Sequence, residues 1–109
     1  MTSDIKKESI ATKNDKFRKT FSGGKVMLTA GVEDDENLNK IIAAVKSFDT
    51  FTEDNDPHGE HDFGNFTLAG ETYFFKVDYY SPDMQGGSED PSDPQKTTRV
   101  LTIMRADEY

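Results

Sequence analysis

The sequence predicts a single α+β domain in which helices cover one face of an antiparallel sheet. Three observations predict this fold class. The length of 109 residues suits one domain, residues 33–48 have the periodicity of a helix, and residues 71–80 and 96–106 are rich in strand-forming side chains. Hydrophobic residues make up only 33 % of the chain, so eight Phe and four Tyr are expected to supply much of a small core.

The N-terminal region predicts a flexible lead-in followed by a short helix. Residues 1–11 are mostly polar, and the folded domain is expected to span residues 12–109. Phe17 and Phe21 are four residues apart, a spacing that places both side chains on one face of a helix over residues 12–21. The domain is therefore expected to begin with a helix that packs through aromatic rings.

A strand and a second helix are expected next. Residues 22–24 are Ser-Gly-Gly and end the first helix, because glycine is favoured just after a last helical turn. Residues 25–32 then predict a strand. Residues 33–48 predict the clearest helix, since apolar side chains recur there at helical spacing. These side chains are Leu38, Ile41, Ile42, Val45 and Phe48.

Three strands complete the predicted order α-β-α-β-β-β. Residues 62–70 are expected to form a short strand that ends in a turn at Ala69 and Gly70. Residues 71–80 form a long strand whose alternate side chains share one face: Tyr73, Phe75, Val77 and Tyr79. Residues 96–106 form the last strand. Because short turns favour neighbouring strands, these three strands are expected to form an antiparallel meander.

Charge is uneven along the chain. The formal net charge is -8, and residues 1–25 carry +4, so the remaining residues carry -12. Such a body repels nucleic acid at long range and attracts basic proteins, although the same charge would also serve solubility alone. The absence of cysteine excludes disulfides and thiol chemistry. No apolar run approaches the roughly 20 residues of a membrane span. We expect a cytoplasmic protein without membrane contact.

Residues 53–66, EDNDPHGEHDFGNF, combine both histidines of the chain with five acidic residues and no Lys or Arg. One interpretation is a transition-metal site, because imidazole and carboxylate groups bind Zn, Mn or Fe. Its ligands would come from His58, Glu60, His61 and Asp62, with Asp54 or Asp78 as a further ligand. The stretch does not match an EF-hand, which needs Glu at position 12, or the HExxH pattern of zinc peptidases.

The other interpretation of residues 53–66 is a shaped acidic turn, and we favour it. Asn55, Asp56 and Asp62 can accept hydrogen bonds from backbone N–H groups, as such residues do in tight turns. His61 can pair with a neighbouring carboxylate. The stretch then carries no chemistry of its own, and the sequence assigns no catalytic residues.

A second acidic segment follows the long strand. Together the two segments could present a row of carboxylates that imitates a phosphate backbone and occupies a basic groove on another protein. The candidate partner-binding residues are Asp54, Asp56, Glu60, Asp83, Glu89, Asp90 and Asp93. The alternative for residues 81–95 is a solvated, mobile loop.

Several strings resemble a known family: NDKFR, VMLTAGV, DNDPHGEHDFG, KVDYY and TRVLTIMRADEY. They are similar to the bacterial domain-of-unknown-function family 3768, and the resemblance runs from about Asn14 to Tyr109. The family has no established activity to carry over. Its small members resemble cargo of proteobacterial phages, plasmids and genomic islands, which implies an accessory or anti-defence role.

The sequence thus predicts a non-enzymatic, acidic protein-binding module of a mobile genetic element. In its concrete form it is an anti-CRISPR or anti-restriction inhibitor that occupies a basic nucleic-acid-binding surface of a host complex, without a cofactor and without direct nucleic-acid contact. The alternative is a metal-binding domain or metal-dependent hydrolase centred on residues 53–62, which would need a divalent metal. A third option is a toxin–antitoxin or regulatory partner.

Overall fold

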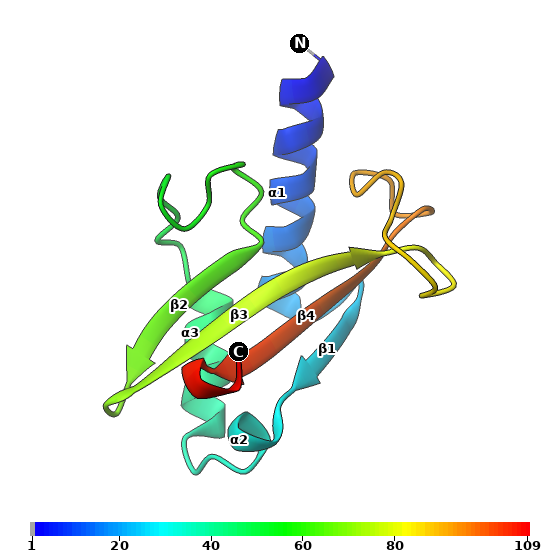
Figure 1. Cartoon of the computed structure of the whole chain (residues 1–109). Coiled ribbons are helices and arrows are strands. Elements are labelled where there is room, and N and C mark those ends of the chain that lie inside the picture. Colours follow the sequence, from blue (N-terminus) through cyan, green and yellow to red (C-terminus); the bar gives the residue numbers. More distant parts are fainter. Residues whose placement is uncertain (1) are drawn as a thin grey trace.

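The computed structural model describes the backbone of residues 2–109 and the side chains of residues 10–109. A four-stranded sheet has helices on one face and a short C-terminal turn on the other (Figure 1). The elements are α1 (Thr2–Thr20), β1 (Lys25–Leu28), α2 (Ala30–Glu33), α3 (Leu38–Ser47), β2 (Phe63–Leu68), β3 (Glu71–Tyr80), β4 (Thr98–Arg105) and η1 (Ala106–Glu108). The α+β class and the single domain with helices on one face are as predicted.

The sheet is mixed, and the prediction of a purely antiparallel sheet is wrong. Its strand order is β1-β4-β3-β2. The meander β2-β3-β4 is antiparallel as predicted, but β1 pairs with β4 in parallel, with Lys25 opposite Val100 and Leu28 opposite Ile103. The reason is the helical connection. Because α3 returns the chain to the end where β1 began, β2 runs in the same direction as β1, and two antiparallel steps give β4 that direction as well.

The core lies between the helices and one face of the sheet. Its buried apolar side chains are Phe17, Val32, Ile41, Val45, Tyr73, Phe75, Val77, Leu101 and Ile103. The alternating face predicted for residues 71–80 is confirmed, since three of its four residues are buried and Tyr79 packs against them. On the opposite face, η1 brings the ring of Tyr109 edge-on to Phe63 and Phe74.

Several predicted boundaries differ from the observed ones. Helix α1 begins at Thr2, so residues predicted as a lead-in are helical. The predicted lead-in covers residues 1–11. Within it, Met1 and the side chains of residues 2–9 lie outside the described residues. The predicted strand 25–32 ends at Leu28, because α2 begins after Thr29, whose carbonyl accepts from the Val32 and Glu33 N–H groups, and Gly31 donates its N–H to Glu108 Oε2.

The predicted helix 33–48 is shorter than expected and begins at Leu38. Asp35 accepts hydrogen bonds from the Asn37 N–H and the Tyr73 hydroxyl, and these hold the segment between α2 and α3 in a turn. The last predicted strand, 96–106, is observed as Thr98–Arg105. Turn η1 was not predicted.

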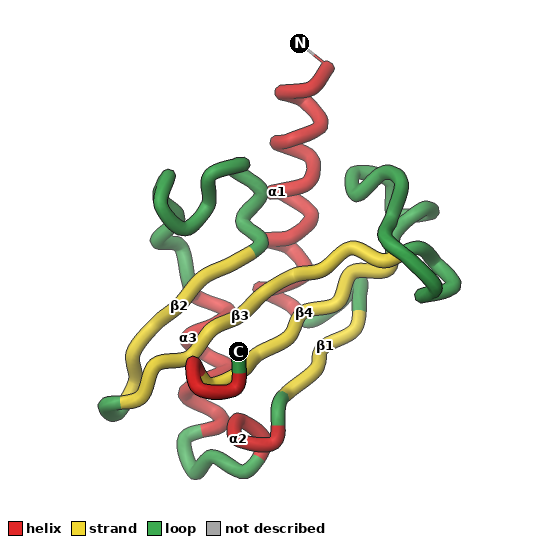
Figure 2. The backbone as a smooth tube through the Cα atoms, viewed as in Figure 1, coloured by secondary structure: helices red, strands yellow, loops and turns green. Residues whose placement is uncertain are grey.

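Both acidic loops lie at the same end of the sheet (Figure 2). The loop over residues 49–62, here called loop A, leads into β2, and the loop over residues 81–97, loop B, connects β3 to β4. Because β2 and β4 begin where β3 ends, both loops lie at this "loop end". The β2–β3 turn, α2 and η1 lie at the "opposite end" (Figure 1). No helix in the described part of the chain is long and apolar enough to cross a membrane.

Candidate functional site

A buried amide joins α1 to both acidic loops. The Asn14 side chain is 0 % exposed. It donates to the Glu60 carbonyl in loop A at 2.9 Å and to the Tyr79 hydroxyl at 2.8 Å. Its Oδ1 accepts from Arg99 Nε at 2.8 Å, and Arg99 in turn donates to the Pro91 carbonyl in loop B. One side chain therefore connects α1, the ends of β3 and β4, and both loops.

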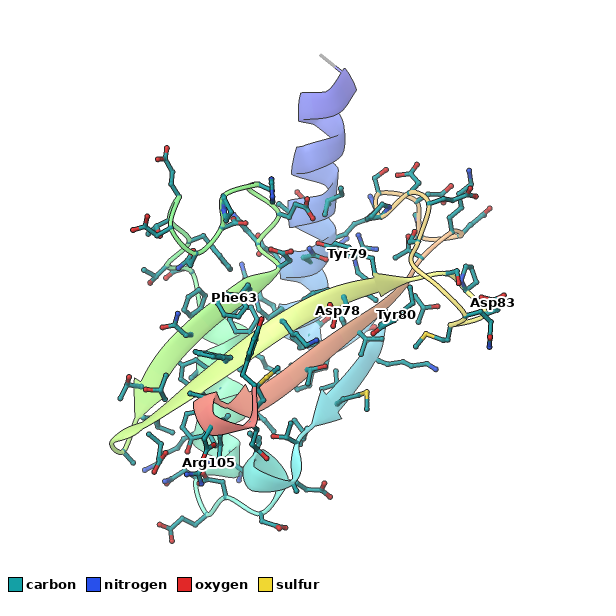
Figure 3. The ribbon with its side chains drawn as sticks, viewed as in Figure 1. Phe63, Asp78, Tyr79, Tyr80, Asp83 and Arg105 are labelled. Carbon is teal, nitrogen blue, oxygen red and sulfur yellow. The ribbon has the colours of Figure 1, made fainter. Side chains whose placement is uncertain are left out.

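Burial changes the proton affinity of the groups around Asn14. The pKa of the Tyr79 hydroxyl is raised, chiefly by burial and further by the charge of Glu60, whose Oε1 accepts a hydrogen bond from it at 2.9 Å. Burial also lowers the pKa of Arg99, whose guanidinium lies over the Tyr79 ring at 5.5 Å. Tyr79 points from β3 toward α1 (Figure 3). The cluster is thus a low-dielectric polar junction.

Contacts of the His61 imidazole with two carboxylates, those of Asp15 and Asp56, fix loop A to α1. The Nδ1 atom of His61 lies 2.9 Å from Asp15 Oδ2, and its Nε2 atom lies 3.8 Å from Asp56 Oδ2. The imidazole stacks on the Phe51 ring at 4.1 Å, with the two planes 2° apart. The φ angle of His61 is 56°, a conformation that costs energy for a residue with a Cβ. The contacts to both carboxylates and to Phe51 offset that cost.

Arg18 extends these contacts inside the protein. The side chain is 1 % exposed and donates to Asp15 Oδ1 at 2.9 Å and to the Val45 carbonyl of α3 at 2.8 Å. Its guanidinium also lies over the rings of Phe51 and Phe75. A buried cation is tolerated when its charge is paired, and the Asp15 carboxylate pairs with Arg18. Arg18 therefore connects loop A, α1 and α3.

The carboxylates of loop A divide into structural and exposed groups. Asp56 is 7 % exposed and accepts hydrogen bonds from the Glu60 and His61 N–H groups, and Asn55 Oδ1 accepts from the Thr52 N–H. The predicted shaping of the turn by these two residues is confirmed. Burial raises the pKa of the Asp62 carboxyl, and repulsion from Glu60 adds to the effect.

The four residues proposed as metal ligands do not converge. His58 is exposed, Glu60 accepts from Tyr79, and His61 is engaged with Asp15. Asp78, proposed as a further ligand, pairs with Lys76 at 2.9 Å. Among the residues that the structure describes, no group of three His, Cys, Asp or Glu side chains is placed to hold a metal ion. An open groove of about 570 Å³ does lie between α1 and loop A, lined by Asp15, Asp56 and His61 among others.

Loop B uses its carboxylates in local turns. Asp83 accepts from Ser81 Oγ at 2.6 Å and from the Gln85 N–H, and these bonds lower the pKa of its carboxyl. Asp90 accepts from Ser92 in the same way, and Asp93 from the Gln95 N–H. Asp83 lies at the outer edge of this loop (Figure 3).

The seven predicted partner-binding residues thus differ in exposure. Asp54, Asp83 and Glu89 are exposed, Glu60, Asp90 and Asp93 are half-buried, and Asp56 is buried. Asp56 shapes loop A and offers its carboxylate to the backbone rather than to solvent. Three of the seven therefore contribute exposed carboxylates, and Asp49 and Glu53 of loop A are exposed as well.

Sequence reasoning missed the polar junction itself. Its members are Asn14, Asp15, Arg18, Tyr79 and Arg99. One signal was present, because Asn14 and Arg18 are four residues apart and flank Phe17 on the face that α1 buries. Polar residues on an apolar helix face indicate a buried hydrogen-bond network. The partners of Asn14 lie 46 to 85 residues away, beyond any local pattern.

Fold and site together define a small acidic α+β domain with two loops fixed at one end by buried polar side chains. The chain belongs to a family described as "Protein of unknown function (DUF3768)", whose model matches residues 28–108. The match begins later than the Asn14 at which the resemblance was expected to start, so α1 and its share of the junction lie before it. No curated protein and no solved structure matches the chain.

Proposed function

We propose that the chain is a non-enzymatic binding module whose loop end docks on a basic surface of another protein. The observation that carries the proposal is the common anchoring of both acidic loops. Asn14 bonds to loop A directly and to loop B through Arg99. Carboxylates on two loops tied to one buried junction hold fixed positions, and a preorganised surface loses less entropy on binding.

Charge and exposure support the same surface. Residues 49–62 contain six acidic residues and no Lys or Arg, and residues 81–97 contain four acidic residues and one Lys. The exposed members come from both loops: Asp49, Glu53 and Asp54 from loop A, and Asp83 and Glu89 from loop B. Such an array attracts a basic groove by long-range electrostatics and sets the association rate more than the affinity.

The specific partner proposed is a nucleic-acid enzyme of a bacterial host. A basic groove that normally binds phosphates fits a row of carboxylates, so the module would compete with the nucleic acid for the groove. In this proposal the chain is a cytoplasmic product of a mobile element and inhibits a CRISPR or restriction complex. The support is its net charge of -8 and the exposed carboxylates on both loops.

The test is a phage-plaquing assay in cells that carry a defined CRISPR or restriction system and express the chain. We expect the chain to raise plaquing efficiency, and the loop-end variant Asp54→Lys/Asp83→Lys/Glu89→Lys to lose this effect. A matched variant, Glu33→Lys/Asp34→Lys/Glu36→Lys, makes the same change in net charge with three exposed residues near α2. It should retain the effect.

The purified complex provides the direct readout. Binding of the chain should weaken steeply with salt, because screening shortens the reach of exposed charges to about 8 Å at physiological ionic strength. Added nucleic acid should displace the chain. Equal loss of binding in both triple variants would mean that net charge alone matters and would contradict docking through the loop end.

A further inference from the structure

Strand β2 forms an unprotected edge of the sheet (Figure 2). Edge strands offer free backbone N–H and C=O groups, and proteins usually shield them by short length, charged side chains or proline. The other edge strand, β1, has only four residues and begins with the exposed Lys25. Strand β2 has six residues, none of them charged and none of them proline. By these criteria β2 is open to pairing with a further strand.

The phase of the β2–β3 hairpin determines which backbone groups of β2 point outward. Its two-residue turn makes Leu68 and Glu71 a hydrogen-bonded pair, and such pairs recur at every second residue. The Val77 N–H donates to the Asp62 carbonyl at 2.8 Å, in the same phase. The residues whose N–H and C=O groups point away from β3 are Phe63, Asn65 and Thr67. In the part of the chain that the structure describes, no hydrogen bond reaches these outward groups.

The side chains of β2 also leave this edge open. Phe66 and Leu68 lie on the face that packs against the core, and both are only half-buried at the margin of the sheet. Asn65 and Thr67, on the other face, are exposed. A strand added here would bury more apolar surface and would also pair the free backbone groups.

We propose that β2 pairs in antiparallel fashion with β2 of a second copy of the chain, which joins the two four-stranded sheets into one. A two-fold axis at Asn65 places this residue opposite itself and Phe63 opposite Thr67, so that all the outward backbone groups are paired. Phe66 then faces Gly64 of the second copy, which has no side chain to obstruct the ring. The edge is therefore complementary to itself.

The antiparallel arrangement keeps the acidic loops of the two copies apart. Loop A precedes β2, so each loop A lies beyond the far end of the other copy's strand. The two Phe63 residues are offset by four positions, or about 14 Å along the strand, which exceeds the Debye length of about 8 Å at physiological ionic strength. A parallel pairing would place the two loops side by side. Charge therefore favours the antiparallel dimer, whose interface is separate from the loop-end surface proposed above.

The experiment combines sedimentation velocity with hydrogen exchange of the full chain over a range of protein concentrations. Because a single strand buries less surface than a standard interface, we expect a weak dimer that dissociates on dilution. The Asn65 and Thr67 amides should gain protection as the dimer forms, whereas the Gly64 and Phe66 amides, which are bonded to β3, should be protected at every concentration. A chain that stays monomeric at millimolar concentration, or a dimer without this added protection, would overturn the proposal.

Exposed residues on the two edge strands give a matched pair of variants. Asn65 lies on β2 and Met27 on β1, and replacing either by lysine adds the same charge. Asn65→Lys should weaken dimerisation at least about tenfold, because like charges directly opposite each other in paired strands repel. Met27→Lys should weaken it less than about twofold. Equal losses in the two variants would overturn the proposal.

Two further readouts separate this interface from other effects. Asn65→Ala leaves the backbone groups intact and adds no charge, so it should retain the dimer; loss of the dimer in this variant would contradict pairing through the backbone. Raising the salt concentration should not weaken the dimer, whereas it should weaken docking through the loop end. Each of the two proposals can therefore fail without the other.

Discussion

The loop end and the opposite end of the molecule use carboxylates in contrasting ways. At the opposite end, the Asp35 carboxyl accepts from the Tyr73 hydroxyl, and Glu108 accepts from Thr29 and from the Gly31 N–H. These bonds lower the pKa of both carboxyls. At the loop end the carboxyls differ: hydrogen bonds within loop B lower the pKa of Asp83, whereas burial and the charge of Glu60 raise the pKa of Asp62 in loop A. Ionised carboxylates therefore stabilise the opposite end and loop B, whereas ionised Asp62 destabilises loop A.

The contrast indicates what each end is for. A carboxylate whose pKa is lowered by folding contributes stability at neutral pH, whereas one whose pKa is raised subtracts from it. Proteins accept such local costs where function requires a particular surface. The loop end keeps its acidic residues despite their mutual repulsion, and the buried junction around Asn14 holds that end together.

Removing the Asn14 amide is expected to have the largest effect. Asn14→Ala leaves the Tyr79 hydroxyl, the Glu60 carbonyl and Arg99 Nε with one partner fewer inside the protein. Unsatisfied buried polar groups are costly, so we expect a loss of about 3 kcal/mol in the free energy of unfolding, measured by urea denaturation.

Hydrogen exchange then locates this effect. Amides of both loops should lose protection in Asn14→Ala. For amides of the β2–β3 turn at the opposite end, the difference between the free energy of local opening and that of global unfolding should stay the same. Loss of protection in only one loop would show that the two loops are held separately and would break the account of a shared junction.

Removing the buried Asp56 carboxylate of loop A is expected to have the next largest effect on the free energy of unfolding. Asp56→Ala removes the acceptor of the Glu60 and His61 N–H groups and should cost about 2 kcal/mol, because Asp56 is buried. The matched change in loop B is Asp93→Ala, which removes the half-buried acceptor of one N–H group and should cost about 0.5 kcal/mol. Equal costs, measured by urea denaturation, would contradict the difference between a buried and a half-buried acceptor.

The Tyr73 hydroxyl at the opposite end is expected to contribute less to the free energy of unfolding. Tyr73→Phe removes the hydrogen bond to Asp35 Oδ2 and should cost about 1 kcal/mol. The same bond is the main cause that raises the pKa of Tyr73 to about 12, and the pKa of Tyr79 is raised as well, so Tyr73→Phe should remove one of two tyrosines that titrate late in an absorbance titration. If Tyr73→Phe loosened the loops instead of the segment around Asp35, the separation of the two ends would be wrong.

The sequence predicted those parts of the fold that depend on local patterns. The strand over residues 71–80 was predicted with its observed bounds because its aromatic residues alternate. The turn at Ala69 and Gly70 was also correct, and both residues have positive φ angles there. The parallel pairing of β1 with β4 could not be read from either strand, because it follows from the path of α3 between them.

Less of the candidate site could be predicted. The shaping of loop A by Asn55 and Asp56 was predicted because those bonds span three to five residues. The contacts of His61 with Asp15 and of Asn14 with Arg99 join residues 46 and 85 positions apart. No local spacing encodes such pairs, so acidic residues that looked alike in the sequence have different roles in the structure.

The most direct measurement compares Asp62→Asn with Asp35→Asn in urea denaturation between pH 3 and pH 7. At pH 7 we predict that Asp62→Asn is more stable than the unaltered chain by about 0.5 kcal/mol, a modest gain because the site is partly solvated, and that Asp35→Asn is less stable. Both differences should shrink as pH falls, because the wild-type carboxyls become protonated: the penalty at Asp62 is relieved and the contribution of Asp35 is lost. A loss of stability in Asp62→Asn at pH 7 would contradict the claim that the loop end keeps its charge at a cost to stability.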